Sequence, residues 1–248
     1  VFRAEGITLH CGIAYDACRE DETGVTVCVK EEGRLIELKA ERLLVATGRT
    51  PNTEALGLAG AGIEQDSRGA IVVDDRMRTS KAGVYAAGDV TDRDQFVYMA
   101  AYGAKLAALN ALNGDSLAYD NSAMPWVVFS DPQVAGVGLS EAAAKAAGHD
   151  VKTSVLPLDN VPRALAARDT RGLIKLVADV KTDRLLGGQI LAPEGADSIQ
   201  TLAMALKFGM TATSLGETIF PYLTTVEGLK LAAQTFDKDV AKLSCCAG

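Results

Sequence analysis

Two adjacent cysteines, Cys245 and Cys246, stand near the end of the 248-residue sequence. Consecutive Cα atoms are about 3.8 Å apart, which is below the usual ~4.4–6.8 Å range for a disulfide. We therefore expect two neighbouring thiols, and the nearby Lys238 and Lys242 favour their thiolate forms. Such a pair of soft ligands suits a thiophilic metal ion. The pair alone leaves metal binding and chance occurrence equally open.

A second candidate is Asp89, which follows the apolar run 84–87 and Gly88. A glycine at the end of a strand allows close approach of the backbone to a ligand. The Asp89 carboxylate could then accept hydrogen bonds from sugar or polyol hydroxyls, while the N-terminus of a following helix supports a diphosphate. The alternative is that Asp89 simply caps that helix.

The third candidate is Tyr222, which follows Pro221 and precedes Glu227 by five positions. A phenol with an ordinary pKa near 10 is a poor proton shuttle at neutral pH, but it can donate a hydrogen bond to a thiolate or a bound ligand. The alternative for Tyr222 is a half-buried aromatic side chain that only packs.

Strands are expected to dominate the first fifty residues. Residues 23–29 and 36–40 alternate in polarity on either side of Gly33, which predicts a hairpin. The continuous apolar run 42–46 predicts a fully buried strand. Beyond it we expect short strands at 70–73 and 84–87, then an alanine-rich helix from about 95 to 112 that ends at Asn113 and Gly114.

The remaining part mixes strands with segregated helices, which is typical of an α+β domain. Strands are expected at 126–129, 134–137, 154–156, 173–178 and 185–191, and helices from Ser140 to Gly148, at 198–208 and at 225–236. The apolar stretches 202–206 and 229–233 could each be buried between two copies of the chain or inside one copy, and both alternatives stay open.

Composition excludes several classes of function. The formal net charge is −7 and the basic residues are scattered, which disfavours nucleic-acid binding. No stretch approaches the roughly 20 apolar residues that a membrane span requires. Five cysteines at irregular spacing argue against a secreted disulfide framework and favour a cytoplasmic protein. We expect Cys11, Cys18 and Cys28 to have no redox role, and His10 and His149 to be surface residues.

Residues 46–52 (Ala-Thr-Gly-Arg-Thr-Pro-Asn) and 84–89 (Val-Tyr-Ala-Ala-Gly-Asp) together resemble the paired motifs of flavoproteins with two dinucleotide-binding domains. The resemblance implies that Gly48 and Arg49 belong to the junction between an NAD(P)H domain and an FAD domain. It also implies that Gly88 and Asp89 bind the ribityl chain and diphosphate of FAD.

The segment 128–138 resembles the start of the interface domain of the disulfide reductases. Glutathione reductase and dihydrolipoyl dehydrogenase carry an acid/base His followed by Pro before the last helix, with a Glu that orients the His. Here the same places hold Tyr222, Leu223 and Glu227. Because an imidazole titrates near neutrality and a phenol does not, the site is not expected to protonate an organic disulfide.

Residues 158–164, 220–224 and 226–236, together with the Cys-Cys tail, resemble the mercuric reductase family over essentially the whole chain. The resemblance implies FAD and NADPH as cofactors, Hg(II) as the substrate that is reduced to Hg(0), and a homodimer. It implies that Cys245 and Cys246 collect Hg(II) and pass it to an inner cysteine pair of the other subunit, beside which Tyr222 lies. Tyr222 and Glu227 are accordingly the expected catalytic residues.

The expected fold is α/β plus α+β. Residues 1–51 are assigned to the end of an NADPH-binding domain, 52–120 to the second part of an FAD-binding domain, and 121–248 to an interface domain. The sequence has neither a Gly-x-Gly-x-x-Gly motif nor a Cys-x4-Cys pair and begins abruptly, so we expect it to be the C-terminal portion of a longer enzyme. The alternatives are another disulfide reductase, such as dihydrolipoyl dehydrogenase, and a non-enzymatic dimerisation or metal-binding module.

Overall fold

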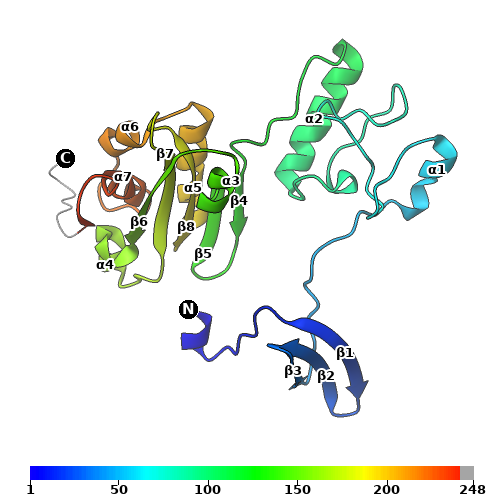
Figure 1. Cartoon of the computed structure of the whole chain (residues 1–248), viewed down its shortest axis with the longest axis horizontal. Helices are drawn as coiled ribbons and strands as arrows, with labels where there is room; N and C mark the ends of the chain where they lie inside the picture. Colours follow the sequence, from blue (N-terminus) through cyan, green and yellow to red (C-terminus); the bar gives the residue numbers. More distant parts are fainter. Residues whose placement is uncertain (241–248) are drawn as a thin grey trace. The chain divides into compact units, whose positions relative to one another are not determined.

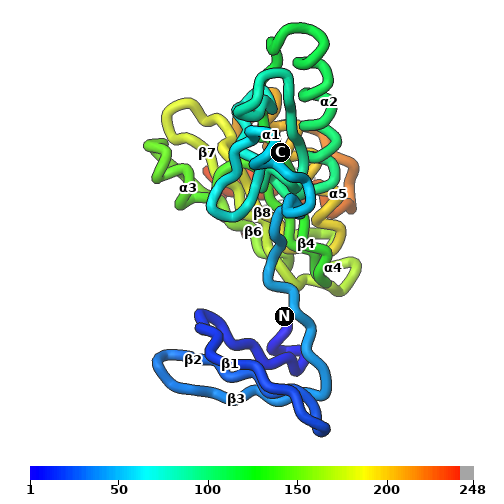
Figure 2. Tube along the Cα trace, turned by 90° about the vertical axis from the view of Figure 1, so that its right-hand side faces the viewer, coloured from blue at the N-terminus to red at the C-terminus, as the bar shows by residue number. Residues whose placement is uncertain are grey.

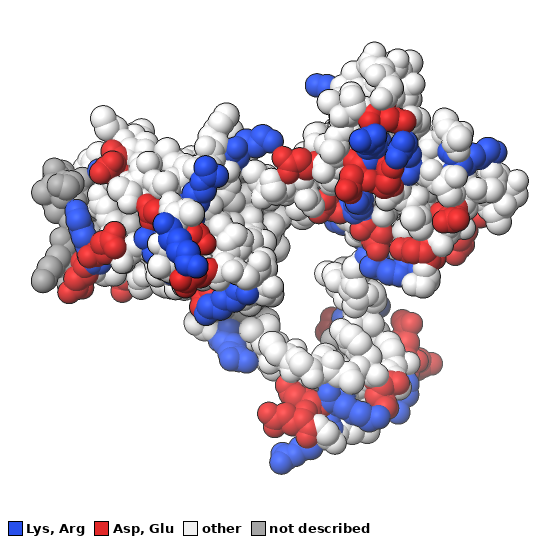
Figure 3. Space-filling view, turned by 45° about the horizontal axis from the view of Figure 1, so that its top comes forward, with Lys and Arg blue, Asp and Glu red and all other residues white. Residues whose placement is uncertain are grey.

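The computed structural model describes residues 1–240, and the chain divides into two compact units, Val1–Tyr119 and Asp120–Gly248 (Figure 1). Cys245 and Cys246 lie outside the described residues. On the face shown in Figure 3, acidic and basic side chains are intermingled, as the scattered charges of the sequence predict.

An antiparallel sheet of three consecutive strands opens the first unit, after a short 3₁₀ helix at Phe2–Glu5: β1 (Ala14–Asp21), β2 (Gly24–Glu31) and β3 (Arg34–Ala40) (Figure 2). The pairing of Glu31 with Arg34 leaves a two-residue turn at Glu32 and Gly33, both with positive φ (49° and 78°). Such a turn matches the twist of the two strands. The hairpin predicted at Gly33 is therefore confirmed.

The buried strand predicted at 42–46 is wrong. No regular strand forms there, and Leu44 and Val45 are 89% and 69% exposed. A strand that is apolar on both faces needs neighbouring strands and a layer on each side. Within the described residues, no strand pairs with this segment.

The rest of the first unit contains little regular structure: 3₁₀ helices at Glu54–Leu56 and Asp89–Thr91, α1 (Leu58–Ala61) and α2 (Val97–Asn113). The strands predicted at 70–73 and 84–87 are reduced to isolated bridges, Gln65 with Ile71 and Arg78 with Tyr85. The predicted long helix is confirmed as α2, with its C-cap at Gly114. Buried Asn110 of α2 fastens the loops around it, because its Nδ2 donates to Arg76 O (3.0 Å) and Leu117 O (2.8 Å).

The second unit contains a five-stranded antiparallel sheet in the order β4-β5-β8-β7-β6 (Figure 1). The strands are β4 (Pro125–Val128), β5 (Gln133–Gly138), β6 (Val151–Pro157), β7 (Leu173–Asp179) and β8 (Leu185–Ala192). Helix α5 (Gly195–Lys207) packs on β4, β5 and β8, and α7 (Glu227–Gln234) packs on β6 and β7. Shorter helices complete the unit: α3 (Glu141–Ala146), η4 (Leu158–Asn160), α4 (Pro162–Ala167) and α6 (Ala212–Glu217). The mixed fold class and each strand expected in this unit are confirmed.

The hydrophobic core of the second unit lies between its sheet and helices α5 and α7. Leu202, Leu229 and Ala232 are fully buried in it, and Ala203 and Ala233 are nearly so. The apolar stretches 202–206 and 229–233 are therefore mainly internal core, which decides between the two alternatives. Within 202–206, Met204 points outward and is 49% exposed.

No helix formed by residues 1–240 has the length and apolar character needed to cross a membrane.

Candidate functional site

The backbone at Gly88 has a conformation that only glycine adopts readily. Its φ of 82° and ψ of −161° fall in a region that is closed to side chains because of steric conflict. A Cβ atom at this position would also lie 3.2 Å from the Cβ of Ala100 in α2. The Gly88 carbonyl accepts hydrogen bonds from the N–H (2.9 Å) and Oγ1 (2.8 Å) of Thr91, which turns the chain sharply after residues 84–87.

The turn leaves the Asp89 side chain exposed. Among residues 1–240, no group forms a hydrogen bond or ion pair with its carboxylate. Helix α2 begins only at Val97, with Phe96 as N-cap, so the alternative that Asp89 caps this helix is wrong. The carboxylate is thus available to accept hydrogen bonds from hydroxyl groups of a ligand.

The segment that contains Gly48 and Arg49 lies against the loop that follows Asp89. Arg49 Nη1 donates to Gln95 O at 2.7 Å, and Arg68 links the two segments by donating to Arg49 O (3.3 Å) and pairing with Asp92 (2.7 Å). Gly48 has a φ of 112°. The structure therefore brings together two motifs that are about forty positions apart in the sequence.

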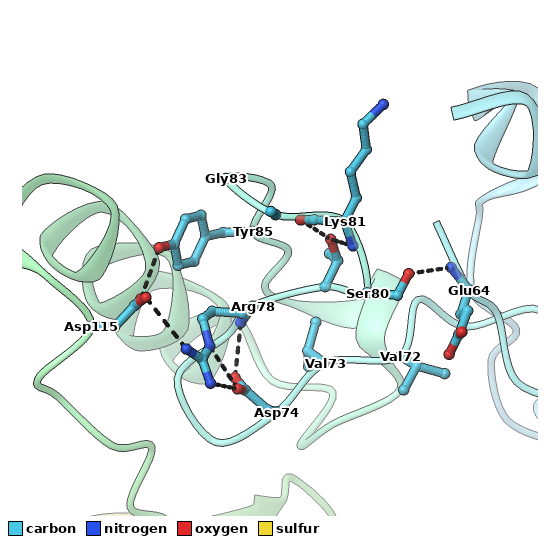
Figure 4. Close-up of a pocket in the computed structure, with 12 residues that line it drawn as sticks. Glu64, Val72, Val73, Asp74, Arg78, Ser80, Lys81, Gly83, Tyr85 and Asp115 are labelled. Carbon is cyan, nitrogen blue, oxygen red and sulfur yellow. Dashed lines mark hydrogen bonds and ion pairs between the residues drawn. The ribbon is translucent and has the colours of Figure 1, made fainter. Parts of the chain in front are cut away.

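A pocket of about 540 Å³ lies in the same unit, and sequence reasoning did not identify it (Figure 4). Arg78 forms ion pairs with Asp74 (2.6 Å) and Asp115 (3.4 Å), and the Tyr85 hydroxyl donates to Asp115 at 2.8 Å. This hydrogen bond raises the pKa of Tyr85 above its ordinary value of 10.0, so the phenol stays protonated at neutral pH. These contacts join the 74–85 loop to the end of α2 and are structural.

Tyr222 lies in the second unit, in the loop between α6 and α7, and 61% of its surface is exposed. The alternative was a half-buried side chain that only packs, and the Tyr222 side chain is more exposed than that. The next residue, Leu223, has a φ of 61°, in the left-handed region that non-glycine residues rarely adopt.

Glu227, in the first turn of α7, is only 3% exposed, and its Oε2 accepts a hydrogen bond from Leu223 N–H at 3.2 Å. The Glu227 N–H in turn donates to Thr224 Oγ1 at 3.3 Å. A Thr followed three positions later by Glu is the sequence pattern of a capping box at a helix N-terminus. This pattern could have located the contact in advance, although here the Glu binds the N–H of the residue before the Thr.

Two further residues belong to this site and were missed. The hydroxyl of Thr225, which is 9% exposed, donates to Oε2 of Glu194 at 3.0 Å. Glu194 precedes α5 and has a φ of 59°. No local pattern in the sequence connects positions 194 and 225, because the contact depends on how α5 and α7 pack.

The cysteines of the first unit do not form a metal site. Cys11 and Cys18 are exposed and Cys28 is buried in β2. Within the described part of the chain, no group of three His, Cys, Asp or Glu side chains is placed to hold a metal ion.

Two family models match the chain. The model for pyridine nucleotide-disulphide oxidoreductases matches residues 1–108, and the model for the dimerisation domain of the same family matches residues 124–233. The chain therefore belongs to the pyridine nucleotide-disulphide oxidoreductases.

Within this family, the chain is similar to curated mercuric reductases, which confirms the predicted resemblance. It is 53% identical to the mercuric reductase of Acidithiobacillus ferrooxidans over 100% of this chain and 44% of that protein. It is 50% identical to the mercuric reductase of Bacillus cereus over 98% of this chain and 39% of that protein. The chain thus spans less than half the length of these two relatives.

Solved disulfide reductases share the fold. A Cu(II) complex of the HOCl-induced flavoprotein disulfide reductase RclA from Escherichia coli matches with a TM-score of 0.79 and 31% identity, over 90% of this chain and 50% of that one. LpdA from Mycobacterium tuberculosis matches with a TM-score of 0.83 and 27% identity, over 96% of this chain and 51% of that one.

Proposed function

We propose that this chain acts, as part of a longer polypeptide, in the reduction of Hg(II) to Hg(0) by NADPH. The observation that carries the proposal is its 53% identity, over its full length, to a mercuric reductase. The electrons balance, because a hydride from NADPH supplies the two electrons that Hg(II) accepts, and NADP⁺ and a proton are released. The cysteine content supports a cytoplasmic location.

FAD is the cofactor that fits the first unit. The exposed Asp89 carboxylate can accept hydrogen bonds from the ribityl hydroxyls, and Gly88 lets the backbone come close to the diphosphate. Gly48 and Arg49 would hold the junction with the NADPH-binding part beside this site. When bound, FAD supplies the transfer of electrons from the nicotinamide to sulfur-bound metal.

The proposed domains are 1–51 (NADPH-binding part), 52–120 (FAD-binding part) and 121–248 (interface domain), and the match to a dimerisation domain supports a homodimer. We assign acquisition of Hg(II) to Cys245 and Cys246, because thiolates exchange metal with competing thiols by direct attack. Tyr222 acts later. Its exposed phenol can donate a hydrogen bond to a metal-bound sulfur presented by a second subunit.

The test uses a full-length chimaera in which this chain replaces the matching part of the Acidithiobacillus ferrooxidans enzyme. Cys245→Ala/Cys246→Ala should slow NADPH-dependent release of Hg(0) mainly when excess thiol competes for Hg(II). Tyr222→Phe, which removes only the hydroxyl, should lower the rate at every thiol concentration. A chimaera that binds flavin but releases no Hg(0) would contradict the proposed reaction. Equal rates for Tyr222→Phe and the parent under both conditions would contradict only the role of the phenol.

A further inference from the structure

The loop that presents Tyr222 is fixed by acidic side chains from two helical elements. Glu227 begins α7, and its almost completely buried carboxylate accepts the N–H of Leu223, the residue directly after Tyr222. Leu223 has a φ of 61°, a conformation that costs a residue with a side chain of order 1–3 kcal/mol. Such a conformation persists only where surrounding contacts enforce it, and the hydrogen bond to Glu227 is such a contact.

The two threonines that follow Leu223 also hold this loop by hydrogen bonds. Thr224 Oγ1 donates to Pro221 O at 2.9 Å and accepts the Glu227 N–H, so one hydroxyl closes the loop across Tyr222. Thr225 Oγ1 then reaches Glu194 Oε2 at the start of α5. The loop is thereby fastened to both helices that cover the sheet.

We propose that Glu194 and Thr225 are positioning residues that, together with Glu227, hold the loop of Tyr222 in place for the reaction. The resemblance to the disulfide reductases already implies an orienting role for Glu227. This inference rests on the proposed function of Tyr222 and deepens it. Glu227 acts through the Leu223 backbone, and Glu194 acts through the Thr225 hydroxyl. The helix beneath them is rigid, because Leu229, Leu231 and Ala232 of α7 are buried in the core. The Tyr222 side chain is 61% exposed.

The first test measures hydrogen exchange of the Leu223 amide in the ¹⁵N-labelled 248-residue chain. Glu227→Ala should speed exchange at least about tenfold, since a protecting hydrogen bond is lost. Glu227→Gln keeps a carbonyl acceptor and should retain most of the protection. Glu217→Ala removes an exposed carboxylate that forms no hydrogen bond or ion pair with the described residues, and serves as the matched control. Unchanged Leu223 exchange in a folded Glu227→Ala chain would overturn the proposal for Glu227.

The second test measures turnover of Hg(II) by the chimaera. Thr225→Val and Glu194→Ala should leave KM nearly unchanged and lower kcat. The loss of kcat should reach about 100-fold if the phenol moves by about 1 Å. Thr225→Ser and Glu194→Gln keep the hydrogen bond and should restore most of the rate. Because Thr225→Val preserves shape, it tests the contact even if Glu227→Ala fails to fold.

A double-mutant cycle separates positioning from general stability. In the Tyr222→Phe background, Thr225→Val should cause little further loss, because the group that it positions is already absent. Losses that multiply in the double variant would overturn the proposal. If Tyr222→Phe alone has no effect, the role of the phenol in the proposed function is wrong, whereas Leu223 exchange still decides whether the loop is held by Glu227.

Discussion

Replacing Gly88 by alanine should disturb the Asp89 site in a measurable and specific way. At φ 82° and ψ −161°, a side chain raises the backbone energy by about 1–3 kcal/mol. The added Cβ would also lie 3.2 Å from Ala100 Cβ, so α2 must shift by a few tenths of an ångström. The two effects act on the same turn, and an energy of about 1–3 kcal/mol corresponds to roughly a 5- to 150-fold change in an equilibrium constant.

The assay is the dissociation constant for FAD of the full-length chimaera, measured by flavin fluorescence after reconstitution. Gly88→Ala should weaken FAD binding by this factor, because Asp89 no longer points where the Gly88 conformation directs it. Gly60→Ala is the matched control: Gly60 lies in α1, has open space at its Cβ position, and should leave the FAD affinity unchanged. An FAD dissociation constant for Gly88→Ala within twofold of the parent would refute the argument that this backbone conformation shapes the site.

Three further predictions concern the 248-residue chain by itself. It should neither retain FAD nor reduce Hg(II) with NADPH, since it lacks a Gly-x-Gly-x-x-Gly motif and a Cys-x4-Cys pair; stoichiometric flavin after purification would contradict this. Hydrogen bonds from Lys145 and Lys175 lower the pKa of Glu141 from 4.5 to about 2. These ion pairs contribute fully to the free energy of unfolding above pH 4.5, and their contribution is lost as the pH falls toward 2. In urea melts, the free energy of unfolding should therefore fall less over this pH range in Glu141→Gln than in the parent. Leu229→Ala should lower the free energy of unfolding of the second unit by about 2–5 kcal/mol, followed by Trp126 fluorescence, whereas Lys230→Ala on the same helix should change it little.

The sequence predicted the second unit well because its elements obey local rules. Ser140 caps α3 by accepting the Ala143 N–H, and the apolar run expected to be a strand at 173–178 forms β7, which pairs with β8. Each strand of this unit finds its hydrogen-bonding neighbour within residues 125–192. In this unit, the structure that the local sequence patterns favour is therefore also the structure that tertiary packing stabilises.

The first unit was predicted less well, because its patterns require partners from elsewhere. The apolar run 42–46 has the composition of a central strand, yet residues 1–240 provide no strand beside it. Residues 70–73 and 84–87 pair only through single bridges, at Ile71 and Tyr85. Composition indicates a preference for extended backbone but cannot provide the neighbouring strands that turn this preference into a sheet.

The candidate site was predicted by residue type but not by contact. Asp89 was identified from its place after Gly88, and the structure then excluded the capping alternative. The catalytic role expected of Glu227 stays a prediction, and the described hydrogen bond of its carboxylate is with the Leu223 backbone. The bond between Thr225 and Glu194 joins residues 31 positions apart, so it follows from tertiary packing alone.

The two halves of the proposed chemistry are therefore supported in different ways. Asp89 is held by a backbone turn in a unit whose regular structure is sparse, and its carboxylate has no partner among the described residues. Tyr222 precedes a helix that is locked in a core and is framed by hydrogen bonds from Thr224, Thr225 and Glu227. Preorganisation of a reacting group requires such a frame, because small displacements reduce rates strongly. The Asp89 carboxylate is thus placed by a single backbone turn, whereas the Tyr222 loop is held by several hydrogen bonds to Glu227 and Glu194.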